Sequence, residues 1–177
     1  MYATISKILQ KFMSKSSIYK YGFNLSPMYR RSTGRIYEVS DDLLTVKVKL
    51  KLSYKNSNYV GSIFGGSLFS ATDPIFMIQL MNILDSNYVV WDKAATIKFK
   101  KPARENCFVN FVFSKEEIEK IKIDVKAKNE IDLIKNIKIT NKDETIVFAE
   151  VSKTIYVADK SFYKEKSKLK KLKMASI

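Results

Sequence analysis

The sequence contains no histidine and only one cysteine, Cys107. These absences exclude Ser-His-Asp and Cys-His catalysis, histidine-ligated metals, CxxC redox pairs and a disulfide within the chain. If the protein is an enzyme, carboxylates, hydroxyls, amides, backbone N–H groups or lysines must carry its chemistry, and we expect no metal and no cofactor. We expect Cys107 to be a small buried side chain. An unpaired thiol favours a reducing compartment, the cytoplasm.

Arginine is scarce, although the chain is strongly basic. The formal net charge is +14, from 32 Lys and Arg against 18 Asp and Glu. Basic surfaces attract polyanions such as nucleic acids. Arginine is the residue best suited to bidentate recognition of phosphates and bases, and no nucleic-acid-binding motif is recognisable. We therefore expect a lysine-rich surface and no specific nucleic-acid site. The four arginines are Arg30, Arg31, Arg35 and Arg104.

Acidic residues are absent before Glu38. We expect residues 1–23 to form an N-terminal amphipathic helix that docks on the domain. An acid-poor amphipathic start is also typical of an organellar transit peptide or an interfacial anchor, so import and peripheral membrane contact stay open. Lysines interrupt any apolar run long enough for a secretory signal. The apolar residues at helical spacing are Ile5, Ile8, Leu9, Phe12 and Met13.

Charge is almost absent between Lys55 and Asp85, where the only charged residue is Asp73. A hydrophobic segment of this length could span a membrane. Its glycines, serines, Gln79 and Asn82 make it too polar for that, and we expect no transmembrane segment. A helix that is apolar nearly all round is typical of one buried inside a domain. The segment reads GSIFGGSLFSATDPIFMIQLMNIL.

Alternating apolar and polar residues predict strands on both sides of this helix. The clearest run, from Leu44 to Tyr54, has one polar face, and residues 33–42 are its expected hairpin partner. Residues 106–113 and a hairpin over 133–158 follow, with a short helix over 114–129 between them. An antiparallel sheet with one polar face and one apolar helix packs best when the sheet curls round the helix. We therefore expect an α+β domain over residues 24–159, followed by a basic tail, 160–177.

The run YVVWDKAATIKFK is also expected to be a strand. Simple alternation places six of its residues on one face, while apolar residues occupy both faces over 88–95. Burial on both faces would require a second subunit. The six residues are Val89, Trp91, Lys93, Ala95, Ile97 and Phe99.

The order of these elements, together with six residues around the buried helix, resembles the hotdog-fold thioesterases. The segment VGSIFGGSLFSATDP and the strand after it are similar to the thioesterase-like branch known as DUF4442. The resemblance implies a sheet wrapped round one long central helix. It also implies a homodimer or a dimer of dimers that hydrolyses acyl-CoA or acyl-carrier-protein thioesters at a subunit interface. The six residues are Asn58, Gly61, Phe64, Gly65, Gly66 and Asp73.

Gly65 and Gly66 lie at the expected start of the central helix, where backbone N–H groups lack intrahelical acceptors and can stabilise an oxyanion. Asp73 is seven residues after Gly66, which places it on nearly the same helix face about 10 Å further along. By resemblance, Asp73 is the nucleophile or the general base, and Asn58 is the polar residue near the attacking water. Alternatively, Asp73 accepts hydrogen bonds at a kink caused by Pro74.

We expect the acyl thioester to contact Phe64, Gly65, Ser67 and Phe69. Lys93 is expected either to pair with Asp73 or to bind a phosphate of CoA; otherwise it extends into solvent from a subunit edge. CoA enters only as part of the substrate.

Many active relatives carry histidine immediately before the glycine pair, where this chain has Phe64. An alternative function is therefore a non-catalytic protein that binds acyl-CoA or lipid. A third is a membrane-surface or nucleic-acid adaptor that uses the N-terminal helix and the basic tail.

Overall fold

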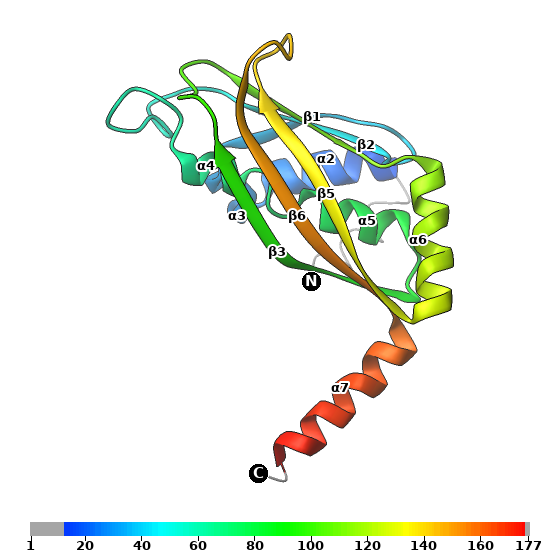
Figure 1. The fold of residues 1–177 in the computed structure, drawn as a ribbon. Coiled ribbons are helices and arrows are strands. Elements are labelled where there is room, and N and C mark those ends of the chain that lie inside the picture. The colour runs from blue at the N-terminus through cyan, green and yellow to red at the C-terminus, as the bar shows by residue number, and fades with distance from the viewer. Residues whose placement is uncertain (1–12, 176–177) are drawn as a thin grey trace.

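A computed structural model describes residues 13–175 of the chain. Its centre is a six-stranded antiparallel sheet with strand order β1-β2-β4-β5-β6-β3. The sheet is strongly curved, and β1 and β3 form its two edges (Figure 1). The α+β class and the curled antiparallel sheet predicted from the sequence are confirmed. The strands are β1 (Gly34–Val39), β2 (Thr45–Leu50), β3 (Tyr88–Phe99), β4 (Cys107–Val112), β5 (Glu130–Thr140) and β6 (Val147–Asp159).

The core lies between the inner face of the sheet and two central helices, α4 (Gly65–Ser70) and α5 (Ile75–Ile83). The alternation of β2 directs Val46, Val48 and Leu50 inward, and all three are fully buried. From α5, the ring of Phe76 packs edge-on against Phe111, with 5.0 Å between ring centroids. Cys107 is also buried, as expected, and burial raises the pKa of its thiol to about 12.

Two N-terminal helices, α2 (Lys15–Leu25) and α3 (Pro27–Arg31), cover the central helices. Ser14 caps α2 by accepting a hydrogen bond from the N–H of Ser17. Tyr19 donates to the carbonyl oxygen of Ile75, and Tyr29 donates to that of Ala71, both over 3.0 Å. Apart from Met13, the apolar residues predicted to form the N-terminal amphipathic face lie outside the described residues.

Two further helices, α6 (Lys115–Lys128) and α7 (Lys160–Ala175), follow β4 and β6. The short helix predicted over 114–129 is confirmed, with Ser114 as its N-cap and Ile118, Ile121 and Val125 buried. The predicted basic tail is helical as far as Ala175, and α7 points away from the domain (Figure 1). No helix within residues 13–175 is long and apolar enough to cross a membrane.

The segment expected to form one long helix is divided into α4 and α5 by a turn over residues 71–74. Pro74 has no N–H, so it cannot continue the hydrogen-bond ladder of a helix. The backbone N–H and side-chain hydroxyl of Thr72 both donate to the carbonyl oxygen of Phe69, which closes α4. Asp73 therefore lies in the turn, and the expectation that it shares one helix face with Gly66 is wrong.

A bulge in β3 changes which residues share a face. Asp92 pairs with Ile155, but the next paired residue is Ala94, opposite Thr154. The unpaired Lys93 shifts the alternation by one position. As a result, Ala95, Ile97 and Phe99 face the same side as Asp92. The prediction that Trp91 and Lys93 share a face with Ile97 and Phe99 is therefore wrong.

Candidate functional site

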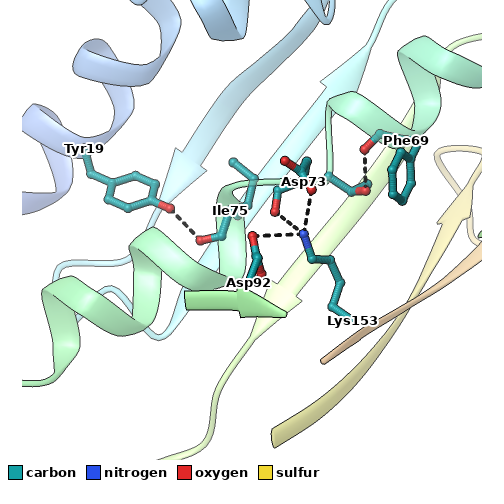
Figure 2. Close-up of polar contacts among 7 residues, drawn as sticks. Tyr19, Phe69, Asp73, Ile75, Asp92 and Lys153 are labelled. Carbon is teal, nitrogen blue, oxygen red and sulfur yellow. Dashed lines mark hydrogen bonds and ion pairs between the residues drawn. The ribbon is translucent and has the colours of Figure 1, made fainter. Parts of the chain in front are cut away.

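A lysine is buried in the centre of the sheet. β6 alternates strictly, and its inward positions hold Val151, Lys153, Ile155 and Val157. The side chain of Lys153 is 0% exposed, and it extends from β6 toward the turn between α4 and α5 (Figure 2). Burying an unpaired ammonium group is costly, so it must be compensated by nearby acceptors.

Three acceptors surround the Lys153 ammonium group. Its Nζ donates to the backbone carbonyl oxygen of Asp73, to Asp73 Oδ1 at 2.9 Å and to Asp92 Oδ2 at 3.1 Å. An ammonium group has three N–H donors, so each donor has one acceptor. Lys153 thus joins β3, β6 and the α4–α5 turn through one buried charge (Figure 2).

Asp92 alternates with the buried Val90 and so faces the inner side of the sheet. The bulge that follows leaves Lys93 on the outer side and returns Ala95 to the side of Asp92. The Asp92 side chain is 23% exposed. Burial raises the pKa of its carboxyl group, the hydrogen bond from Lys153 opposes the rise, and the charge of Asp73 adds to it. Asp92 Oδ1 is buried and accepts no hydrogen bond from the residues described.

Asp73 is the accessible member of the cluster, with a side chain that is 56% exposed. Oδ1 is held by Lys153, whereas no hydrogen bond within residues 13–175 reaches Oδ2. The helix break explains this geometry, because the turn directs Oδ1 inward while the rest of the side chain faces solvent. Such a carboxylate is oriented by one oxygen and can accept a proton on the other.

The two glycines at the start of α4 allow close approach of aromatic rings. A Cβ at Gly65 would lie 2.7 Å from Phe99 Cζ, and one at Gly66 would overlap the ring of Phe64. The N–H groups of both glycines donate to no acceptor within the described part of the chain. The Phe64 ring, 58% exposed, therefore lies against the glycine backbone proposed to bind an oxyanion.

The remaining predicted site residues lie in different settings. Ser67 is buried in α4, and Phe69 is partly buried against the core. Asn58 closes its own loop, since its Oδ1 accepts from the N–H groups of Val60 and Ser62 and its Nδ2 donates to Ser62 Oγ.

The prediction that Lys93 pairs with Asp73 is wrong. The bulge directs Lys93 outward, where its Nζ pairs with Asp132 in an exposed ion pair. Asp73 pairs with Lys153 instead.

Sequence reasoning missed Lys153 and Asp92. A signal for Lys153 was present, because it occupies an inward position in the alternation of β6. The signal for Asp92 was ambiguous, because simple alternation places it opposite Ile97 and Phe99, and the bulge reverses that assignment. Within residues 13–175 no group of three His, Cys, Asp or Glu side chains could hold a metal ion; the position between Asp73 and Asp92 is filled by the Lys153 ammonium group.

Comparison with solved structures shows a shared fold. A Pseudomonas aeruginosa protein of unknown function, described as a probable thioesterase, is 17% identical with a TM-score of 0.72, over 81% of this chain and 95% of that one. A Staphylococcus aureus thioesterase is 12% identical with a TM-score of 0.55, over 75% and 99%. A Haemophilus influenzae thioesterase is 11% identical with a TM-score of 0.51, over 90% and 91%. At these identities the likeness concerns the fold.

A comparison with curated proteins finds no match. The family model described as a domain of unknown function, DUF4442, matches residues 16–157, which is most of the chain. The chain therefore belongs to the DUF4442 family, and its fold is the hotdog fold of the thioesterases to which it is similar.

Proposed function

We propose that the protein hydrolyses an acyl thioester and that Asp73 is its catalytic carboxylate. The observation that carries this proposal is the asymmetric setting of Asp73, with one oxygen held by the buried Lys153 and the other accessible to solvent. A general base must be held in position and still reach the proton that it removes. The thioesterases of the same fold support the choice of reaction class.

In the proposed reaction, Asp73 removes a proton from water as the water oxygen attacks the thioester carbonyl carbon. The carbon–sulfur bond then breaks, and the proton passes to the departing thiolate, which leaves a carboxylic acid and a thiol. Direct attack by Asp73 would instead form a mixed anhydride that water hydrolyses. In a single turnover in ¹⁸O-labelled water, label in Asp73 would establish direct attack followed by hydrolysis at the aspartyl carbonyl, because the general-base route places the label only in the released acid.

The N–H groups of Gly65 and Gly66 are proposed to stabilise the oxyanion, and Phe64, Ser67 and Phe69 to contact the acyl chain. The glycine N–H groups have no acceptor among the described residues, which leaves them available to a substrate. Asn58 and Lys93 stay predictions as substrate contacts, and so does the cytoplasmic location.

A second candidate function is binding of an acyl thioester without hydrolysis. The Phe64 ring occupies the space that a Cβ on Gly66 would take, and in this position it narrows the approach to Gly66. If the ring stays in place when a ligand binds, the oxyanion cannot reach the N–H group of Gly66. The protein would then hold the thioester without stabilising its transition state.

The test is thiol release from a panel of acyl-CoA chain lengths by wild type, Asp73→Asn and Asp132→Asn. We expect Asp73→Asn to lower kcat at least about a hundredfold, the usual contribution of a positioned general base. Asp132 is the matched control, because its carboxylate also pairs with a lysine but on the solvent side. Unchanged turnover in Asp73→Asn would refute the proposed role. Saturable binding without turnover in any variant would establish the second candidate.

A further inference from the structure

Three of the four arginines of the chain line one groove, which has a volume of about 520 Å³. The groove runs between the end of α3, the start of β1 and the loop after β2. Thr33 and Ser53 also line it, and its cationic lining consists of Arg30, Arg31, Arg35, Lys51 and Lys55.

The lining is positively charged without compensation. No acidic residue lines the groove, and none of its five cations forms an ion pair with a described residue. Lys47 of β2 shows the contrast, because it pairs with Glu38 at 2.8 Å. Placing like charges side by side costs free energy, which a bound anion would recover.

The groove is rigidly built on a buried asparagine. Asn56 is 3% exposed, and its Nδ2 donates to Thr33 Oγ1 at 2.8 Å and to the carbonyl oxygen of Lys51 at 3.0 Å. These bonds tie the two walls together. Arg35 donates to the carbonyl oxygen of Gly34 at 2.8 Å, which holds its guanidinium near the α3–β1 turn.

The same groups connect the groove to the candidate site. The carbonyl oxygen of Asn56 accepts from the N–H of Phe64 at 2.7 Å, directly before α4. At the other end of α4, Tyr29 of α3 donates to Ala71, two residues before Asp73. The groove walls therefore pack against both ends of α4.

We propose that this groove binds a small ligand carrying two or more phosphate groups. Guanidinium groups bind phosphates through paired hydrogen bonds, and serine, threonine and backbone groups complete such sites. A concave site of this size suits a small molecule. The ligand is either the nucleotide end of a CoA thioester, a choice that rests on the proposed function, or a free nucleotide polyphosphate.

The first test measures binding of adenosine 3′,5′-bisphosphate, CoA, ATP and phosphopantetheine to the full chain by calorimetry. We expect at least one of the first three to bind at least tenfold more tightly than phosphopantetheine, which has one phosphate. Arg31→Gln/Arg35→Gln should weaken that binding by about tenfold for each arginine. Lys126→Gln/Lys142→Gln removes the same amount of charge, but from α6 and the β5–β6 turn. This control variant should bind the ligand as tightly as wild type does.

Competition binding and enzyme kinetics show whether the bound phosphates belong to CoA or to a free nucleotide. If CoA is the source, adenosine 3′,5′-bisphosphate displaces CoA, and the arginine variant raises KM for acyl-CoA but not for acyl-phosphopantetheine. If a free nucleotide is the source, ATP binds in the groove while KM for acyl-CoA stays constant. Asp73→Asn, which lacks the proposed base, should bind the nucleotide as tightly as wild type does. Nucleotide binding by wild type without turnover of any acyl-CoA would refute only the proposed function.

Three results would overturn the groove proposal. The first is equal affinity for all four compounds. The second is an equal loss of binding in the arginine variant and the lysine control, which would indicate net charge alone. The third is tighter binding of a duplex oligonucleotide or an acyl-carrier protein than of any nucleotide at physiological salt, with that binding lost in the arginine variant. Circular dichroism of each variant confirms that the fold is intact.

Discussion

At the scale of single residues, Lys153 is the side chain whose loss we expect to affect the stability of the core most. It is fully buried and compensated by two carboxylates. We expect Lys153→Met to lower the free energy of unfolding by about 2–4 kcal/mol, because it leaves Asp92 with a partly buried and unpaired charge. Lys93→Met, which removes an exposed pair, should cost less than about 1 kcal/mol. Urea denaturation measures both.

The double variant Asp92→Asn/Lys153→Met tests the reason for that loss. If the unpaired Asp92 charge causes the destabilisation, neutralising it should recover part of the stability, so the two substitutions should not be additive. Strict additivity would show that the Asp92 charge does not cause the loss of stability.

The pH dependence of stability should report the burial of Asp92. Because its pKa is raised in the native state, the native protein keeps a proton on this carboxyl group at pH values where the unfolded chain has lost it. The unfolded state then binds fewer protons, so the contribution of Asp92 to the free energy of unfolding falls as pH rises from the ordinary Asp pKa to the raised one. Above that pH range the contribution of Asp92 to the free energy of unfolding is constant.

Asp92→Asn removes this contribution. The stability of wild type minus that of Asp92→Asn should therefore fall with rising pH across that range and then level off. Urea denaturation at a series of pH values from acid to neutral measures the difference. A difference that stays constant or increases with pH would contradict the raised pKa.

At the scale of elements, Gly34 lies where β1, α3 and the end of α4 meet. A Cβ there would lie 2.9 Å from Tyr29 Oη and 3.0 Å from Ala71 Cβ. Both neighbours are fully buried and Tyr29 is hydrogen-bonded, so neither can move easily. We expect Gly34→Ala to destabilise the protein by about 1–3 kcal/mol.

Gly22 provides the matched control. It lies inside α2, and a Cβ there would meet no atom within 4 Å. Gly22→Ala should therefore raise stability by up to about 1 kcal/mol, because alanine favours the helix. Equal effects of the two substitutions in thermal unfolding would show that the contact between β1 and α4 is not tight.

The strands and their hairpins could be predicted because their signals are local. The alternation of β2 identifies its buried face, and the turn over residues 141–146 separates two runs with the same period. The break before α5 was the less visible feature, because an apolar sequence continues through it. Pro74 was the one local signal, and it favoured the kink over the continuous helix.

The candidate site could be predicted only in part. Asp73 stands out as a lone carboxylate in an apolar segment, but its partner comes from β6, eighty residues away in the chain. Asp92 shares the inner face with Ile97 and Phe99 only because Lys93 is left out of the pairing between β3 and β6. Such register shifts depend on the fit of whole strands, which alternation within one strand does not report.

At the scale of the whole molecule, the sheet has an exposed edge of unusual length. β3 has 12 residues and pairs only with β6 within the described chain. Figure 1 shows this strand at the border of the sheet. A long edge strand offers unpaired N–H and C=O groups to another chain, and Trp91 within β3 is 53% exposed. We therefore expect a homodimer, or a dimer of dimers, in which this edge region is covered.

Trp91 is the only tryptophan in the chain, so its fluorescence reports this region alone. On association of subunits along β3, its emission should shift to shorter wavelength as protein concentration rises, in parallel with the mass from light scattering. Trp91→Asp would place a charge in the covered region and should weaken association at least about tenfold. Tyr59→Asp, at an exposed aromatic in the loop after β2, is the control. A dimer whose tryptophan emission does not change would be formed through another surface, and a monomer at micromolar concentration would leave the site within a single subunit.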